Sequence, residues 1–203
     1  YFFMHGTPFI YQGQEIGMTN VQLPNIEDYD DVAIKNLYRE KIAEGVPHQD
    51  MMEIIWASCR DNSRTPMQWN DEMNAGFTTS TPWFSMNPNY KEINVEKQKN
   101  EEKSIFNFYK KMIALKKEHD VLNYGTYDLL LEDDPQIYAY TRTLQDEKVI
   151  VISNISKEEA VYNEGSFALE RKRLLLNNYE VAEHEEVTTI ALKPYETRVY
   201  RIS

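Results

Sequence analysis

The stretch GTPFIYQGQEIGM, residues 6–18, decides the fold that the sequence predicts. After the Gly-Thr-Pro turn, the apolar residues of Phe9–Tyr11 follow one another without polar alternation, and Gly13 ends the run. Such runs are typical of a strand buried on both faces of a parallel sheet. A single parallel strand cannot form a sheet, so its neighbours are expected upstream. The sequence therefore predicts a fragment, and it predicts that Phe9–Tyr11 leaves an exposed apolar surface that drives self-association.

Helical periodicity follows this stretch in three places. Apolar residues recur at helical spacing over residues 31–44 and 48–57, with Gly-Val-Pro between them. Residues 101–119 give the clearest helix, with an apolar stripe, an acidic start and a basic end. Residues 60–99 lack periodicity but are rich in aromatic side chains, which indicates an ordered, functional loop.

From residue 123 onward the sequence changes to short β-type runs. These are TYDLLL, QIYAYTR, KVIVISN, RLLLNN, VTTIAL and TRVYRI, separated by turn residues. This succession of short strands and turns predicts an antiparallel β-sandwich of about eighty residues. The fold class is therefore an α+β fragment, with an α/β portion followed by an all-β domain.

Composition narrows the possible partners. A net charge of −11 argues against nucleic acids and anionic membranes. Cys59 is the single cysteine, which excludes an internal disulfide and fits a reducing cytoplasm. No catalytic signature accompanies that cysteine. His5, His48, His119 and His184 do not cluster at ligand spacing and no glycine-rich phosphate loop is present, so neither a metal nor a cofactor is expected.

Several motifs together carry a resemblance to a known family. GTPFIYQGQEIGM resembles the eighth-strand motif of the α-amylase superfamily of glycoside hydrolases, and RDNSRTPMQW with NAGFT and NPNYKEINVEKQ resembles its oligo-1,6-glucosidase group. The resemblance implies the last strand and helices of a (β/α)₈ TIM barrel followed by a β-sandwich. Residues 1–122 would hold the end of helix 7, strand 8, a long loop with helices and helix 8, and residues 123–203 the sandwich.

The resemblance also implies where the chemistry lies. Retaining glycosidases use two carboxyl groups about 5 Å apart, and the family carries its catalytic acids on earlier strands. The chain is therefore expected to hold no catalytic residue and to be inactive alone. Glu15 is expected to support the end of strand 8 without performing chemistry.

Arg60, in the stretch SCRDNSRTPMQWN at residues 58–70, is the main candidate for substrate binding. A planar guanidinium with five donors suits adjacent sugar hydroxyls, and the family's matching arginine grips the non-reducing-end glucose. Arg64 is a second candidate, with Asp61 as their support. The alternative is that both arginines pair with Asp61 or other loop acids and only hold the bend.

The aromatic residues of the long loop have two interpretations. They could stack on sugar rings or form the loop's own small core, and they are Trp69, Phe77, Trp83, Phe84 and Tyr90. Ala33 stands where relatives often carry an acidic residue, so the resemblance does not imply the fine specificity.

The resemblance implies a cytoplasmic α-glucosidase that acts on glucose-containing oligosaccharides, with α-1,6 bonds as the main linkage and α-1,4 bonds as a second one. The partner of this chain would be the missing N-terminal part of its own barrel. The alternatives are a trehalose-6-phosphate hydrolase, a sucrose isomerase, a non-catalytic scaffold relative, and an independent sugar-binding module.

Overall fold

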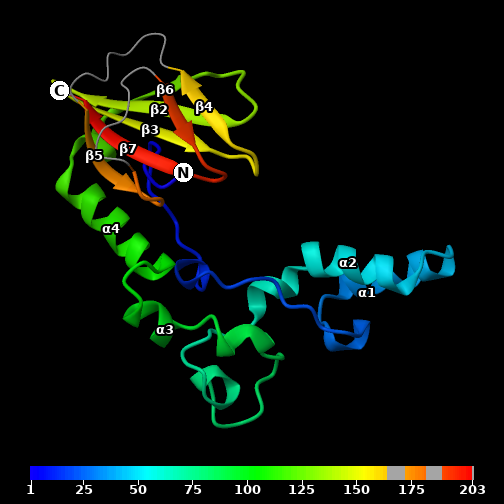
Figure 1. Ribbon diagram of the computed structural model, residues 1–203. Helices are drawn as coiled ribbons and strands as arrows, with labels where there is room; N and C mark the ends of the chain where they lie inside the picture. The colour runs from blue at the N-terminus through cyan, green and yellow to red at the C-terminus, as the bar shows by residue number, and fades with distance from the viewer. Residues whose placement is uncertain (164–171, 182–188, 203) are drawn as a thin grey trace. The chain divides into compact units, whose positions relative to one another are not determined.

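The structure is a computed structural model that describes residues 1–163, 172–181 and 189–202 (Figure 1). It divides into two compact units. The sheet unit comprises Tyr1–Phe9 and Phe108–Ser203, and the helical unit comprises Ile10–Asn107.

The helical unit is built from helices joined by short 3₁₀ turns. The α-helices are α1 (Val32–Ala43), α2 (His48–Ser58), α3 (Val95–Asn100) and the start of α4 (Ile105–Glu118). The 3₁₀ turns are η1 (Gln14–Ile16), η2 (Ile26–Asp28), η3 (Arg60–Arg64), η4 (Met73–Gly76) and η5 (Pro88–Lys91). One buried cluster holds this unit together, and its members are Val21, Leu23, Ile26, Tyr29, Met52, Ile55, Cys59 and Phe84.

Asparagine side chains order the long loop over residues 60–99. The Nδ2 of Asn87 donates to the carbonyl of Thr19 at 3.1 Å, so it ties the loop back to residues before α1. Asn94 accepts the main-chain N–H of Lys97 and caps α3. Asn and Asp side chains favour such local caps and turns, which explains order without helical or strand periodicity.

Helix α4 starts later than the periodicity predicts. Ser104 accepts the main-chain N–H of Asn107 at 3.1 Å, which makes it the N-cap, and the helix begins at Ile105 rather than at residue 101. A capping hydroxyl satisfies a donor that the first helical turn leaves unpaired.

The sheet unit contains the last part of α4, the short helix α5 (Val121–Tyr124) and the strands. They are β1 (Thr126–Leu130), β2 (Ile137–Leu144), β3 (Glu147–Asn154), β4 (Ala160–Asn163), β5 (Lys172–Asn177), β6 (Thr189–Leu192) and β7 (Thr197–Ile202). A five-stranded antiparallel sheet has the order β1-β2-β3-β7-β5, and β4 pairs with β6 in a second sheet. The antiparallel strands agree with the predicted β-domain, although β4 was missed.

Both faces of the larger sheet are covered. One face packs against β4 and β6 in a cluster that includes Ile150, Ile152 and Ile190. The other face, with Tyr140 and Val151, packs against the N-terminal segment, α4 and α5. Burial on both faces explains why β2 and β3 read as almost continuous apolar runs.

A buried arginine joins three segments of the sheet unit. Arg142, on β2, is fully buried and donates hydrogen bonds to main-chain carbonyls. Its Nη1 reaches the carbonyl of Phe3 at 2.6 Å and that of Leu122 at 3.0 Å, while Nη2 reaches Gly125 at 2.8 Å. Its Nε lies 3.3 Å from the carbonyl of Thr126. Burial lowers the pKa of this guanidinium.

The expected eighth strand is not formed in this chain. Residues 7–11 lie outside any strand, and Phe9 is 86% exposed, Ile10 38% and Tyr11 58%. The strands within the described residues pair antiparallel with one another, so this segment has no parallel neighbour to bond with. The expectation of burial on both faces is therefore wrong for this chain, while the expected exposed apolar surface is confirmed.

Candidate functional site

The bend after α2 is organised around Asp61. This residue lies in η3, is fully buried, and accepts the main-chain N–H groups of Asp30 at 2.7 Å and of Asp31 at 2.9 Å through Oδ2. Its Oδ1 accepts from Nη1 of Arg64 at 2.9 Å. A buried carboxylate needs such partners, since an unpaired buried charge is costly. Asp61 therefore ties the bend to the residues that precede α1.

Arg60 is held by a different carboxylate. Its Nε lies 2.8 Å from Oδ2 of Asp31, and its Nη2 lies 2.8 Å from Oδ1 of the same side chain. The two partners differ in burial, because the Arg60 side chain is 68% exposed and that of Asp31 only 2%. The Arg60 guanidinium lowers the pKa of Asp31 to about 2. This two-point contact fixes the plane of the guanidinium and leaves its outer edge open to solvent.

The predicted site residues are only partly brought together. Arg60, Asp61 and Arg64 share η3, and Arg64 pairs with Asp61 as the structural alternative supposed. Glu15 lies in η1 and is half-buried, and no hydrogen bond joins it to that group within the part of the chain that the structure describes. Its Oε2 is buried without a hydrogen-bond partner there.

Asp31 is the residue that sequence reasoning missed. Its acidic type directly before the periodic run of α1 is a recognisable N-cap signal, and its Oδ1 accepts the N–H of Ala33 at 3.0 Å. The pairing with Arg60 has no local signal, because the two residues are far apart in the sequence.

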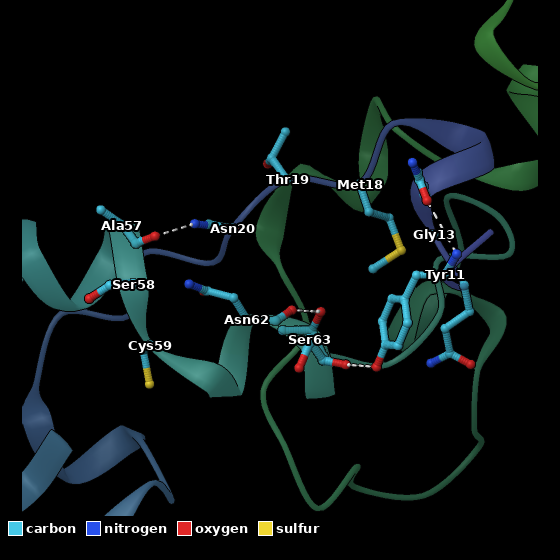
Figure 2. A pocket seen from close by; sticks show the side chains of 13 residues that line it. Tyr11, Gly13, Met18, Thr19, Asn20, Ala57, Ser58, Cys59, Asn62 and Ser63 are labelled. Carbon is cyan, nitrogen blue, oxygen red and sulfur yellow. Dashed lines mark hydrogen bonds between the residues drawn. The ribbon is translucent and has the colours of Figure 1, made fainter. Parts of the chain in front are cut away.

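A pocket of about 330 Å³ is lined in part by Asn62 and Ser63 of η3, and Arg60 is not among its lining residues (Figure 2). The Tyr11 hydroxyl donates to the carbonyl of Ser63 at 2.8 Å, and Nδ2 of Asn20 donates to the carbonyl of Ala57 at 3.2 Å (Figure 2). The residues that line the pocket carry hydroxyl, amide and sulfur groups but no charged side chain. They are Tyr11, Gln12, Gly13, Gln14, Met18, Thr19, Asn20, Ala57, Ser58, Cys59, Asn62, Ser63 and Thr65.

Cys59 in this pocket lacks the properties of a nucleophile. The side chain is buried, and burial raises the pKa of its thiol. Reactive cysteines have the opposite shift, because the thiolate is the attacking species.

The loop aromatics divide between the two interpretations. Phe84 is buried in the core of the helical unit, as a loop mini-core requires. Trp69, Phe77 and Trp83 are exposed, whereas Tyr90 is half-buried. The core interpretation therefore fits Phe84, while the exposed rings are available for contacts.

The described residues hold neither a cluster of metal-ligating side chains nor a membrane-spanning helix. No group of three or more His, Cys, Asp or Glu side chains in them could hold a metal ion, and His184 lies outside the described residues. None of the helices in residues 1–163, 172–181 and 189–202 is both long and apolar enough to cross a bilayer.

Comparisons with known proteins place the chain in a family. Residues 1–125 match the model of the α-amylase catalytic domain, and residues 127–199 match that of the maltogenic amylase C-terminal domain. An oligo-1,6-glucosidase from Parageobacillus thermoglucosidasius is 54% identical over 201 residues, which cover 98% of this chain and 36% of that protein.

Solved structures agree with these matches. The crystal structure of a trehalose-6-phosphate hydrolase from Bacillus licheniformis has a TM-score of 0.93 at 43% identity, covering 100% of this chain and 37% of that one. An isomaltulose synthase from Klebsiella sp. LX3 has a TM-score of 0.86 at 38% identity, covering 97% and 35% of the two chains.

The chain thus spans about a third of the length of the relatives it matches. The predicted fold class and the resemblance are both confirmed by the two adjoining domain matches. Because the catalytic-domain model alone matches more than half of the chain, the chain belongs to the α-amylase family.

Proposed function

We propose that the chain is the C-terminal part of a retaining α-glucosidase. The whole enzyme hydrolyses α-1,6 bonds, and α-1,4 bonds as a second linkage, at the non-reducing ends of short glucose-containing oligosaccharides. Residues 1–122 complete its catalytic barrel and residues 123–203 form the sandwich. The catalytic carboxylates come from the N-terminal part of the barrel, which is also the main partner of this chain, and the enzyme is cytoplasmic.

The observation that carries the proposal is the state of Arg60. Its guanidinium is 68% exposed, yet Asp31 fixes its orientation at two atoms. An exposed arginine with a fixed plane can donate to adjacent sugar hydroxyls at little further cost in side-chain order. Arg60 therefore donates to the terminal glucose, and Arg64 and Asp61 hold the bend that carries it. Glu15 supports the chain near η1 without a described hydrogen bond to these residues.

Sequence identity favours oligo-1,6-glucosidase activity over trehalose-6-phosphate hydrolase activity. The oligo-1,6-glucosidase from Parageobacillus thermoglucosidasius is 54% identical to this chain, whereas the trehalose-6-phosphate hydrolase from Bacillus licheniformis is 43% identical.

The test is Arg60→Ala in the intact enzyme with isomaltose as the substrate. Losing charge-assisted hydrogen bonds worth about 1.5–4 kcal/mol in total lowers kcat/KM by about 10- to 1000-fold. Arg39→Ala is the matched control, because this exposed arginine on α1 bonds only to Asn36 among the described contacts. Unchanged kinetics for Arg60→Ala end the proposal.

A substrate panel separates the related activities. The intact enzyme is expected to cleave isomaltose faster than trehalose-6-phosphate and to release glucose rather than isomerise sucrose. No hydrolysis by either the intact protein or its variants would instead identify a non-catalytic scaffold. The 203-residue chain alone is expected to be inactive.

A further inference from the structure

Arg60 and Asp31 meet side-on, with two parallel hydrogen bonds of 2.8 Å each. We infer that Asp31 is the positioning residue for Arg60, holding the guanidinium plane so that the outer edge, including Nη1, faces the sugar. This inference rests on the proposed function and assigns a role to a residue that touches no substrate itself.

The carboxylate that does the holding is itself anchored. Asp31 is buried, and its Oδ1 also accepts the N–H of Ala33 at the start of α1. Its own main-chain N–H donates to Oδ2 of Asp61 at 2.9 Å. Since Asp61 directly follows Arg60 in the chain, these contacts close a ring that runs from Arg60 through Asp31 and Asp61 back to Arg60.

The ring has a consequence for binding. A free surface arginine has many rotamers, and a ligand that immobilises it loses part of its binding energy to that ordering. The buried Asp31 orders Arg60 before any sugar arrives. Because the same carboxylate caps α1, the guanidinium is also fixed relative to that helix.

The chain offers a substitution that separates the two roles of Asp31. Serine is as good an N-cap as aspartate, but its side chain is shorter and uncharged, so Asp31→Ser preserves α1 and releases Arg60. Asp30→Ser is the matched control, because Asp30 is the exposed neighbour and contributes only its main-chain N–H to Asp61. Where Asp31→Ser fails to fold, Asp31→Asn replaces it, since asparagine also caps helices.

The experiment is a double-mutant cycle on kcat/KM for isomaltose in the intact enzyme. Asp31→Ser is expected to lower kcat/KM by about 3- to 10-fold, the cost of ordering one long side chain, while Asp30→Ser leaves it unchanged. In the Arg60→Ala background, Asp31→Ser is expected to have no further effect, because it acts only through Arg60.

Two results overturn the inference. The first is an undiminished Asp31→Ser effect in the Arg60→Ala background, which would assign Asp31 to the fold alone. The second is full activity of Asp31→Ser alongside an impaired Arg60→Ala. If Arg60→Ala itself has full activity, the proposed function fails and the inference falls with it, so the two failures are distinguishable.

Discussion

Replacing Arg142 with methionine tests what a buried charge does in the sheet unit. The guanidinium is fully buried and makes four hydrogen bonds to main-chain carbonyls. The described contacts include no carboxylate partner for it. Replacing a buried ion pair with apolar residues is often neutral when both partners are replaced. Here the carbonyl acceptors belong to the main chain and remain after the substitution.

The magnitude follows from those orphaned carbonyls. Phe3, Leu122 and Gly125 are buried residues, and each unsatisfied carbonyl costs about 1–3 kcal/mol. The substitution also removes the desolvation cost of the buried guanidinium, which offsets part of the cost of the unsatisfied carbonyls. Arg142→Met is therefore expected to lower the free energy of unfolding by about 3–5 kcal/mol. At a urea slope of about 2 kcal/mol/M, the midpoint falls by roughly 1.5–2.5 M.

The assay is urea unfolding followed by circular dichroism. Arg173→Met is the matched control, because Arg173 lies exposed on β5 of the same sheet, and such surface changes stay within about 0.5 kcal/mol. If the two variants unfold at the same urea concentration, the carbonyls do not depend on Arg142 and the reasoning is refuted.

Two further predictions concern the helical unit and the exposed segment. The pKa of Asp31 falls from 3.8 to about 2 beside Arg60, so the stabilisation by its carboxylate is complete above pH 4 and is lost as the pH falls towards 2. The difference in Tm between the native protein and Asp31→Ser should therefore be constant from about pH 5 to 8 and shrink below pH 4. A difference that persists at pH 2 would contradict this. Phe9 is 86% exposed, so Phe9→Ser is expected to reduce self-association of the isolated chain on size-exclusion chromatography, whereas a clean monomer before the substitution would contradict the prediction.

Features with local signals were predictable from the sequence. Helix α1 was expected over residues 31–44 and spans Val32–Ala43, and α2 was expected over 48–57 and spans His48–Ser58. Both boundaries follow from apolar spacing and from the Gly-Val-Pro punctuation between the helices. The helix over residues 101–119 was right in type but began too early, because the Ser104 cap was overlooked.

Features that depend on distant contacts were not predictable in the same way. Strand β4 has only four residues, Ala160–Asn163, and its pairing with β6 is what makes it a strand. The run VTTIAL was expected to begin at residue 187. Residues 182–188 lie outside the described residues, and within the described residues β6 begins at Thr189. Asp31 and Arg142 likewise carry no pattern that reveals their partners, since those partners lie elsewhere in the sequence.

The arginines of this chain differ in what their donors face, and that difference points to function. Arg142 is buried among main-chain carbonyls, and Arg198 is buried against Glu196 with its Nε 2.7 Å from Oε1. Both guanidinium groups are enclosed by the sheet unit and serve its stability. Arg60 is held at two atoms by a buried carboxylate, but two-thirds of its side chain remains exposed. An oriented cation that this third of the enzyme leaves uncovered can donate to a ligand held between it and the N-terminal part of the barrel, which is why Arg60 carries the functional proposal.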